Sequence, residues 1–340
     1  IKKRMFVFED SGRDTATVMV YMCGTDLESK SAMATKDLLE MTKAKLGGNV
    51  RVVVYTGGCT KWQNEIVSAS NNQIYEVLSG GLKCVRDNAG SASMVEPSTL
   101  SEFIRWCATN YPANRNLLIF WDHGGGSVSG YGYDQKYPRK GSMSLAGIDT
   151  ALKDGGVKFD AIGFDACLMA TVETGLMLNQ YADYMIASEE TEPGIGWYYT
   201  DWLTALSRNT SMSTVDLGKN ICDTFVSTCN KECRGQSATL SVIDLAEFCY
   251  TVPDKLTAFA PYTTGIPRRK KKDLEIIKQF YDVSTLIDEF ERFDDVKRTY
   301  FGVVETEIGY RGNGITPKNA LEDTIQAAIC IGSRGKRSSD

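Results

Sequence analysis

The sequence NLLIFWDHGGGS, residues 116–127, sets the main constraint on the fold. Its unbroken apolar run from Leu117 to Trp121 predicts a strand that is buried on both faces, as strands of parallel sheets are. The strand ends at His123, which is the only histidine in 340 residues, and three glycines follow it. A side chain that titrates near neutral pH therefore stands at a strand end, before a turn whose backbone can approach a ligand closely.

Further strands and helices alternate along the chain. The other expected strands cover residues 17–24, 49–58, 158–165, 183–190 and 237–245. The expected helices lie between the first two strands to about residue 45, and at residues 99–111, 145–153 and 167–180. Thr99 and Glu102 have the spacing of a capping box, and Pro112 marks the end of that helix. The alternation predicts an α/β fold, a mostly parallel central sheet with helices on both faces.

The chain is expected to have two parts. Residues 1–245 contain the alternating strands and helices, and residues 246–340 turn mainly helical and polar, which predicts a smaller C-terminal subdomain. A basic run at residues 267–272 is expected to be a solvated loop, because 38 basic and 43 acidic residues give a net charge of -5. That charge gives no electrostatic reason to bind nucleic acid.

Membrane and metal functions are also disfavoured. No apolar run approaches the roughly 20 residues that a membrane-spanning helix needs. The first 12 residues hold too few apolar side chains for a signal peptide, so any targeting segment is expected outside this sequence. Ten cysteines show no C-x-x-C pair, which with one histidine excludes the usual zinc-ligand spacing. Most of these cysteines are expected to be reduced and inert.

Cys167 is the expected exception, because it follows strand 158–165 at the start of an expected helix. The two strands before His123 and Cys167 are consecutive, so both side chains are expected at one edge of the sheet. A helix dipole would stabilise the Cys167 thiolate, and the N–H groups of Gly124 and Cys167 could form an oxyanion hole. This pattern favours acyl transfer by a thiolate. Asp122 could orient the imidazole or only end the strand.

Two alternatives must be weighed against this interpretation. The DHGGGS segment could be an ordinary turn and Cys167 a core cysteine. H-G-G-G is also the oxyanion loop of serine esterases, but these need a G-x-S-x-G elbow and a separate catalytic histidine. The chain contains neither, so the serine alternative is the weaker one.

Four segments, in order, resemble blocks of the clostripain-like cysteine peptidases: TVMVYMCGTDLES, NLLIFWDHGGGS, DAIGFDACLMATVE and IASEETEPGIGW. The resemblance covers residues 15–250 and implies the three-layer sandwich of the wider group with a caspase-like fold. It implies a cysteine endopeptidase with His123 and Cys167 as the catalytic dyad. A catalytically silent scaffold of the same fold, which binds partners, is the alternative that an intact dyad disfavours.

The resemblance also implies a substrate class. Asp165 corresponds to the acidic residue at the base of the S1 pocket, which receives an arginine, or a lysine, at P1, the substrate residue before the cleaved bond. A carboxylate suits a guanidinium, although Asp165 could instead cap the helix expected after it. Tyr198 stands where many relatives have a second acidic residue. The other candidates for this pocket are Glu189, Trp197 and Asp201.

Processing and location follow from the same resemblance. Family members are commonly zymogens, which predicts self-cleavage in the loop near residues 134–146, after Lys140, Arg139 or Lys136, although that loop could simply be basic and exposed. The light and heavy fragments are expected to stay associated, and the protein to be secreted or extracytoplasmic in a bacterium. No cofactor is expected to be required; Glu190 and Glu192 are candidate calcium ligands, without EF-hand spacing.

Overall fold

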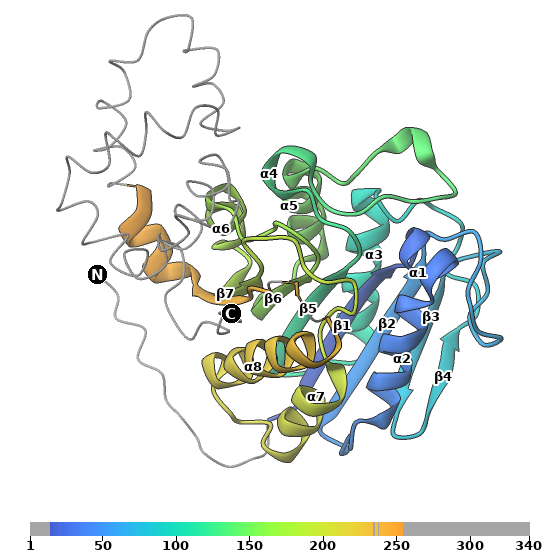
Figure 1. The fold of residues 1–340 in the computed structure, drawn as a ribbon, viewed down its shortest axis with the longest axis horizontal. Helices are drawn as coiled ribbons and strands as arrows, with labels where there is room; N and C mark the ends of the chain where they lie inside the picture. The colour runs from blue at the N-terminus through green and yellow to red at the C-terminus, as the bar shows by residue number, and fades with distance from the viewer. Residues whose placement is uncertain (1–13, 234, 237, 254–340) are drawn as a thin grey trace, which may run out of the picture.

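The computed structural model describes residues 14–233, 235–236 and 238–253. Within them, one sheet has the strand order β4-β3-β2-β1-β5-β6-β7-β8 (Figure 1). Strands β2, β1, β5, β6 and β7 pair in parallel, and β3, β4 and β8 add antiparallel pairs at the two edges. The strands are β1 (Ala16–Cys23), β2 (Val50–Gly57), β3 (Gln73–Leu78), β4 (Gly81–Arg86), β5 (Arg115–Trp121), β6 (Phe159–Asp165), β7 (Ala182–Ala187) and β8 (Ser241–Asp244).

Helices cover both faces of this sheet, so the predicted three-layer α/β sandwich is confirmed. In Figure 1 one group lies in front of the sheet: α2 (Met33–Lys43), α7 (Tyr199–Arg208) and α8 (Thr214–Glu232). The group behind it consists of α3 (Pro97–Asn110), α5 (Leu145–Gly155) and α6 (Val172–Leu178). Three short elements lie in loops: α1 (Thr25–Ser31), α4 (Gly126–Ser129) and the 3-10 helix η1 (Pro138–Lys140).

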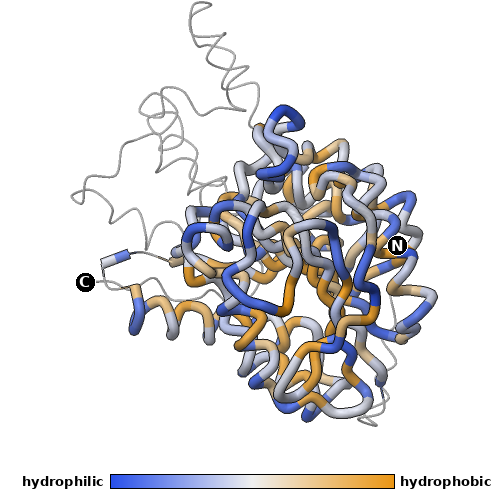
Figure 2. The backbone as a smooth tube through the Cα atoms, turned by 90° about the vertical axis from the view of Figure 1, so that its right-hand side faces the viewer, coloured by the Kyte–Doolittle hydropathy of each residue, from blue (hydrophilic) through white to orange (hydrophobic). Residues whose placement is uncertain are grey.

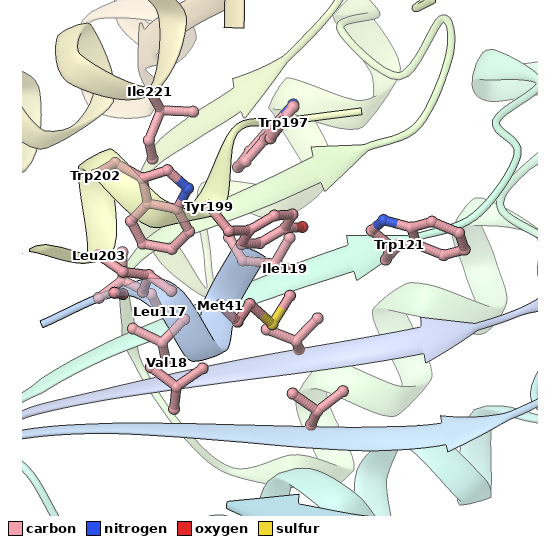
Figure 3. Close-up of a cluster of buried hydrophobic side chains, with 14 of the residues drawn as sticks. Val18, Met41, Leu117, Ile119, Trp121, Trp197, Tyr199, Trp202, Leu203 and Ile221 are labelled. Atoms are coloured by element: carbon pink, nitrogen blue, oxygen red, sulfur yellow. The ribbon is translucent and has the colours of Figure 1, made fainter. Parts of the chain in front are cut away.

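Side chains of the central strands alternate between two hydrophobic cores, because successive residues of a strand point to opposite faces. In β1, Val18 and Val20 face the core under α2, α7 and α8, whereas Met19 and Tyr21 face the core under α3, α5 and α6. Figure 3 shows Val18 beside Leu117 and Ile119 of β5, with side chains of α2, α7 and α8 above them. Hydrophobic residues accordingly gather in the middle of the molecule and hydrophilic ones in outer loops (Figure 2).

Several predicted elements are confirmed, and two helix starts are wrong. The helix predicted from Thr99 begins at Pro97, with Glu96 as its N-cap, and Thr99 donates its hydroxyl to the Ser93 carbonyl at 2.8 Å. Proline suits the first helical turn, so the helix starts before the supposed capping box. The helix predicted from Cys167 begins at Val172. The β3–β4 hairpin was not predicted.

A buried guanidinium joins the start of β5 to the segment between α7 and α8. Arg115 donates from Nη1 to the carbonyls of Thr210 and Met212 at 2.6 and 2.7 Å. Its Nη2 donates to the Thr214 hydroxyl at 3.1 Å, and its Nε lies 3.2 Å from the Asp160 carboxylate. The segment after α7 therefore depends on one side chain of the central sheet.

The predicted C-terminal subdomain lies almost entirely outside the described residues. Residues 245–253 are helical, and residues 254–340 are not described. Within the described part of the chain, no helix combines the length and apolar character needed to cross a membrane.

Arg115→Met is expected to lower the free energy of unfolding by about 3 kcal/mol, because it leaves buried carbonyls and a carboxylate without their donor. The matched control is Arg51→Met on β2, where Nε lies 3.6 Å from Glu76 in an ion pair that is 45% exposed at the arginine. That control should change stability by no more than about 0.5 kcal/mol. Urea unfolding of both variants measures this, and equal midpoints would contradict the assigned role.

Candidate active site

The carboxyl ends of β5 and β6 lie side by side. Trp121 pairs with Asp165 in the parallel register, so His123 and Cys167, each two residues further on, leave the sheet at equivalent positions. Gly124 packs directly on the turn that holds Cys167, because a Cβ at Gly124 would lie 2.0 Å from the Cys167 carbonyl oxygen. The predicted adjacency of these strand ends is confirmed, and only glycine fits at position 124.

The imidazole of His123 contacts two side chains from other segments. Its Nε2 lies 2.9 Å from Asp26 Oδ1, and its ring stacks on Tyr133, with centroids 5.6 Å apart and an interplanar angle of 18°. Tyr133 donates its hydroxyl to the same Asp26 oxygen at 2.6 Å. Partial burial opposes ionisation of Asp26, but hydrogen bonds from Tyr133, His123 and Lys30 outweigh it and lower its pKa to about 2.

Asp26 was not predicted from the sequence, and Asp122 does not orient the ring. The available signal for Asp26 was its place just after β1, whose carboxyl end lies beside that of β5. Asp122 instead accepts from the Thr25 hydroxyl at 2.9 Å and the Tyr133 N–H at 2.9 Å. Burial raises the pKa of Asp122 well above its usual value. Asp122 therefore follows the end of β5, and its hydrogen bond from the Tyr133 N–H connects the Tyr133 loop to this strand.

Cys167 lies in an irregular turn and not at a helix N-terminus. The N-cap of α6 is Thr171, so the predicted stabilisation of the thiolate by a helix dipole is wrong. The half-buried sulfur instead accepts from the Glu192 N–H at 3.2 Å. Burial raises the pKa of the Cys167 thiol, and that hydrogen bond lowers it only in part. The thiol is therefore neutral near pH 7 and needs a base to ionise.

In the described loops that follow β5 and β6, the N–H groups of Gly125 and Leu168 are bonded, whereas those of the residues just before them are not. Leu168, which follows Cys167, has a φ of 65°, and its N–H donates to the Glu190 carbonyl at 2.9 Å. In the histidine loop, the Gly125 N–H donates to Gly130 at 2.9 Å. In the part of the chain that the structure describes, no hydrogen bond to another residue involves the N–H of Gly124 or of Cys167. Both are available to an oxyanion.

The Asp165 side chain is buried at the carboxyl end of β6. It caps no helix, so the alternative role of Asp165 as a helix N-cap is wrong. It accepts from the Tyr199 hydroxyl at 2.8 Å and the Trp197 N–H at 3.2 Å. Burial raises the pKa of Asp165 to about 7, against the opposing effect of those hydrogen bonds. It points to the same face of the sheet as Gly163 of β6, which Trp197 covers. Figure 3 shows Trp197 and Tyr199 on that face.

Asp165 belongs to a group of carboxyl groups that the sequence did not bring together. Asp37 of α2 accepts from the Trp121 indole N–H at 2.6 Å. A Cβ at Gly196 would lie 3.0 Å from Asp165 and 3.2 Å from Asp37, so the two carboxyls share this small space. The Glu192 carboxyl interacts with Asp165 and with the Ala166 N–H, but neither of its buried oxygens has a hydrogen bond of ordinary geometry. Burial raises the pKa of Asp37 and of Glu192 well above the usual value.

The other predicted pocket and metal residues lie elsewhere. Glu189 is buried and accepts from the Ser241 hydroxyl of β8 at 2.6 Å, and Asp201 is exposed on α7. Trp197 is fully buried over Gly163 in the core, so its ring forms no open wall. Among the described residues, no group of three or more His, Cys, Asp or Glu side chains could hold a metal ion, Glu190 and Glu192 included.

The predicted cleavage loop is anchored at its base and exposed at its tip. Tyr131 and Met143 exchange backbone hydrogen bonds of 2.9 Å in both directions. Arg139 and Lys140 are exposed on η1, and Lys140 forms an ion pair with Glu96. The Lys136 side chain is less accessible, because it is half-buried and its Nζ donates to the Ala69 carbonyl at 3.1 Å.

Comparisons with known proteins agree with this fold. The family model described as the Clostripain family matches residues 20–306. Clostripain of Hathewaya histolytica is 28% identical in an aligned region that covers 32% of this chain and 24% of that protein. The chain thus aligns with about a quarter of the length of that relative.

Two solved structures share the fold. A secreted C11 cysteine protease from Bacteroides thetaiotaomicron, in complex with an irreversible peptide inhibitor, is 22% identical, with a TM-score of 0.56 over 69% of this chain and 67% of that one. An inactive zymogen C11 protease from Parabacteroides distasonis is 21% identical, with a TM-score of 0.54 over 70% of this chain and 64% of that one.

The buried carboxyls predict a specific pH dependence of stability. Asp165 has a pKa of about 7 in the folded protein and an ordinary value of 3.8, so between these values the folded state binds a proton that the unfolded state releases. Glu40, whose pKa burial raises to about 7, acts in the same direction. The free energy of unfolding should therefore fall as the pH rises from about 4 to 7.

Urea unfolding at pH 5.5 and 7.5 measures this effect. Asp165→Asn should reduce the difference between the two pH values, whereas Asp201→Asn, at an exposed position, should leave it unchanged. A pH dependence that is the same in all three proteins would contradict the buried state of Asp165.

Proposed function

The chain belongs to the clostripain family of cysteine peptidases, and from this we propose that it is a cysteine endopeptidase with Cys167 as nucleophile and His123 as general base and acid. One observation carries the assignment of these residues. The register of β5 and β6 places them at equivalent strand ends, with Gly124 packed against the Cys167 carbonyl. The chain has no second histidine that could serve as the base.

The reaction follows from the state of each group. His123 takes the proton of the Cys167 thiol, and the sulfur attacks the scissile carbonyl carbon to form a C–S bond. The N–H groups of Gly124 and Cys167 stabilise the resulting oxyanion. The imidazolium gives its proton to the departing amine as the C–N bond breaks. His123 then activates a water molecule, which hydrolyses the thioester and releases the second product.

The proposed substrates are proteins or peptides with a basic P1 residue, arginine first and lysine second. The support is the group of Asp165, Glu192 and Asp37, whose carboxyls lie together and among which the buried Glu192 oxygens have no hydrogen bond of ordinary geometry. A guanidinium or ammonium group supplies both the donors and the charge that this group lacks. Glu192 thereby takes the place of the second acidic residue that Tyr198 does not provide.

Self-processing is proposed at the exposed tip of the loop near residues 134–146. Arg139 and Lys140 are favoured over Lys136, whose side chain is tied to Ala69. A cut there separates β5 from β6, but these strands pair in parallel in the middle of the sheet. The light and heavy fragments should therefore stay associated through the sheet and both cores.

Secretion and calcium dependence are two further proposals. The Bacteroides thetaiotaomicron relative is described as secreted, and we extend secretion to this chain. Calcium at Glu190 and Glu192 remains a prediction that a chelator would test.

Fluorogenic peptides that differ only at P1 test the proposed activity. Arginine and lysine should be cleaved, and aspartate at P1 should not be. Cys167→Ala and His123→Ala should each lose at least about 10³-fold in kcat/KM, because each removes one half of the reacting pair. Asp165→Asn should lose the basic preference, while Asp201→Asn should retain it. Activity that survives Cys167→Ala, or hydrolysis of ester substrates alone, would refute the proposal.

Self-processing has a separate test. Wild-type protein should mature into two fragments that co-purify, and Cys167→Ala should remain one chain. The double variant Arg139→Gln, Lys140→Gln should not be cut in the loop, whereas Lys136→Gln should mature normally. Fragment masses identify the bond, and maturation of purified Cys167→Ala at the same bond would show that another protease makes the cut.

A further inference from the structure

The histidine ring is held by a partner that lies 97 residues away in the sequence. Asp26 Oδ1 is 2.9 Å from His123 Nε2, and the Tyr133 ring stacks against the imidazole at 5.6 Å. The first contact fixes one nitrogen and the second fixes the plane of the ring. Together they leave little rotational freedom to a side chain that is 43% exposed.

Asp26 is itself fixed, and it is ionised. Its Oδ1 accepts the Tyr133 hydroxyl at 2.6 Å, and its Oδ2 lies 3.2 Å from Lys30 Nζ. These donors, with His123, outweigh its partial burial and bring its pKa to about 2. A carboxylate can only accept hydrogen bonds, so the nitrogen that faces it must carry the hydrogen. In neutral His123 that nitrogen is Nε2, and the lone pair is on Nδ1.

We propose that Asp26 and Tyr133 are positioning residues: Asp26 holds His123 as its Nε2–H tautomer, and Tyr133 fixes the ring plane and the carboxylate. Nδ1 is then the nitrogen that takes the thiol proton in the proposed reaction, so this last step rests on the proposed function. The tautomer itself does not, because it follows from the contact with Asp26 alone. His123 Nε2 keeps its hydrogen bond to the carboxylate in the neutral ring and in the imidazolium.

Other charged and titratable groups lie around the contact between His123 and Asp26. Lys30 lies on the far oxygen of Asp26 and is 73% exposed, and Asp26 itself is 28% exposed, so solvent screens both. The buried Asp122 precedes His123 and accepts from the Tyr133 N–H, and Cys167 lies in the turn against which Gly124 packs. The hydrogen bond from His123 Nε2 to the Asp26 carboxylate is therefore the contact that selects the tautomer.

The single histidine makes a direct measurement feasible. Untagged protein labelled with ¹⁵N-histidine gives one pair of ring nitrogen resonances, and their shifts identify the protonated nitrogen at high pH. The Cys167→Ala background keeps the chain intact. The expected result is Nε2–H. Asp26→Asn should populate the Nδ1–H form, because an amide can also donate.

Matched variants separate positioning from a structural role. Lys30→Met keeps the Asp26 carboxylate and should keep the tautomer. Tyr133→Phe keeps the stacked ring and should also keep it, whereas Tyr133→Leu removes the stacking and should broaden the ring resonances. In wild-type background, Asp26→Asn should lower kcat by about 10- to 10³-fold with KM nearly unchanged.

Each outcome has one meaning. An Nδ1–H tautomer with Asp26 in place overturns the proposal, even if Asp26→Asn does not fold. An unchanged tautomer in Asp26→Asn overturns it as well. If the resonances behave as expected but Cys167→Ala still cleaves peptides, the positioning of His123 stands and the proposed function fails.

Discussion

The site depends on the parallel, in-register pairing of β5 with β6. Parallel strands end at the same edge, so residues at equal distances beyond Trp121 and Asp165 leave the sheet together. His123 and Cys167 are two such residues, although 44 positions separate them in the sequence. The register also explains why Gly124 has to be glycine, since the two turns that follow the strands touch at the Cys167 carbonyl. A slip by one residue would separate the pair and bury the wrong faces.

The same alternation that builds the cores places the acidic group beneath the site. Residues 161, 163 and 165 of β6 point toward α2 and α7, and at residue 163 a glycine makes room for Trp197. Asp165 takes the last of these positions, where the sheet ends and the core opens toward the loop of Glu192. Its neighbour on β5, Trp121, donates its indole N–H to Asp37 of α2. The apolar layer therefore holds these carboxyls close together and raises their pKa values.

The sequence predicted what depends on local pattern and adjacent strands, and missed what depends on distant contacts. Apolar runs located β1, β5 and β6, and consecutive strands with a crossover predicted the edge shared by His123 and Cys167. The helix expected at Cys167 failed because residues 168 and 170 donate to the carbonyls of Glu190 and Ser188, so the turn follows a neighbouring segment. For Asp26 the only signal was its place just after β1, and Asp37 had none, since their partners lie 97 and 84 residues away.

The distribution of charge differs between the cysteine side and the histidine side of the proposed site. On the cysteine side, burial raises the pKa of the thiol, and the Asp165 carboxyl behind it adds to that effect. No helix N-terminus compensates, because α6 begins at Val172. On the histidine side, Asp26 is ionised and partly exposed. In the proposed reaction, a proton that moves from sulfur to imidazole therefore leaves a buried group for one that faces a carboxylate, and the N–H groups of Gly124 and Cys167 are the proposed donors to the negative charge that follows.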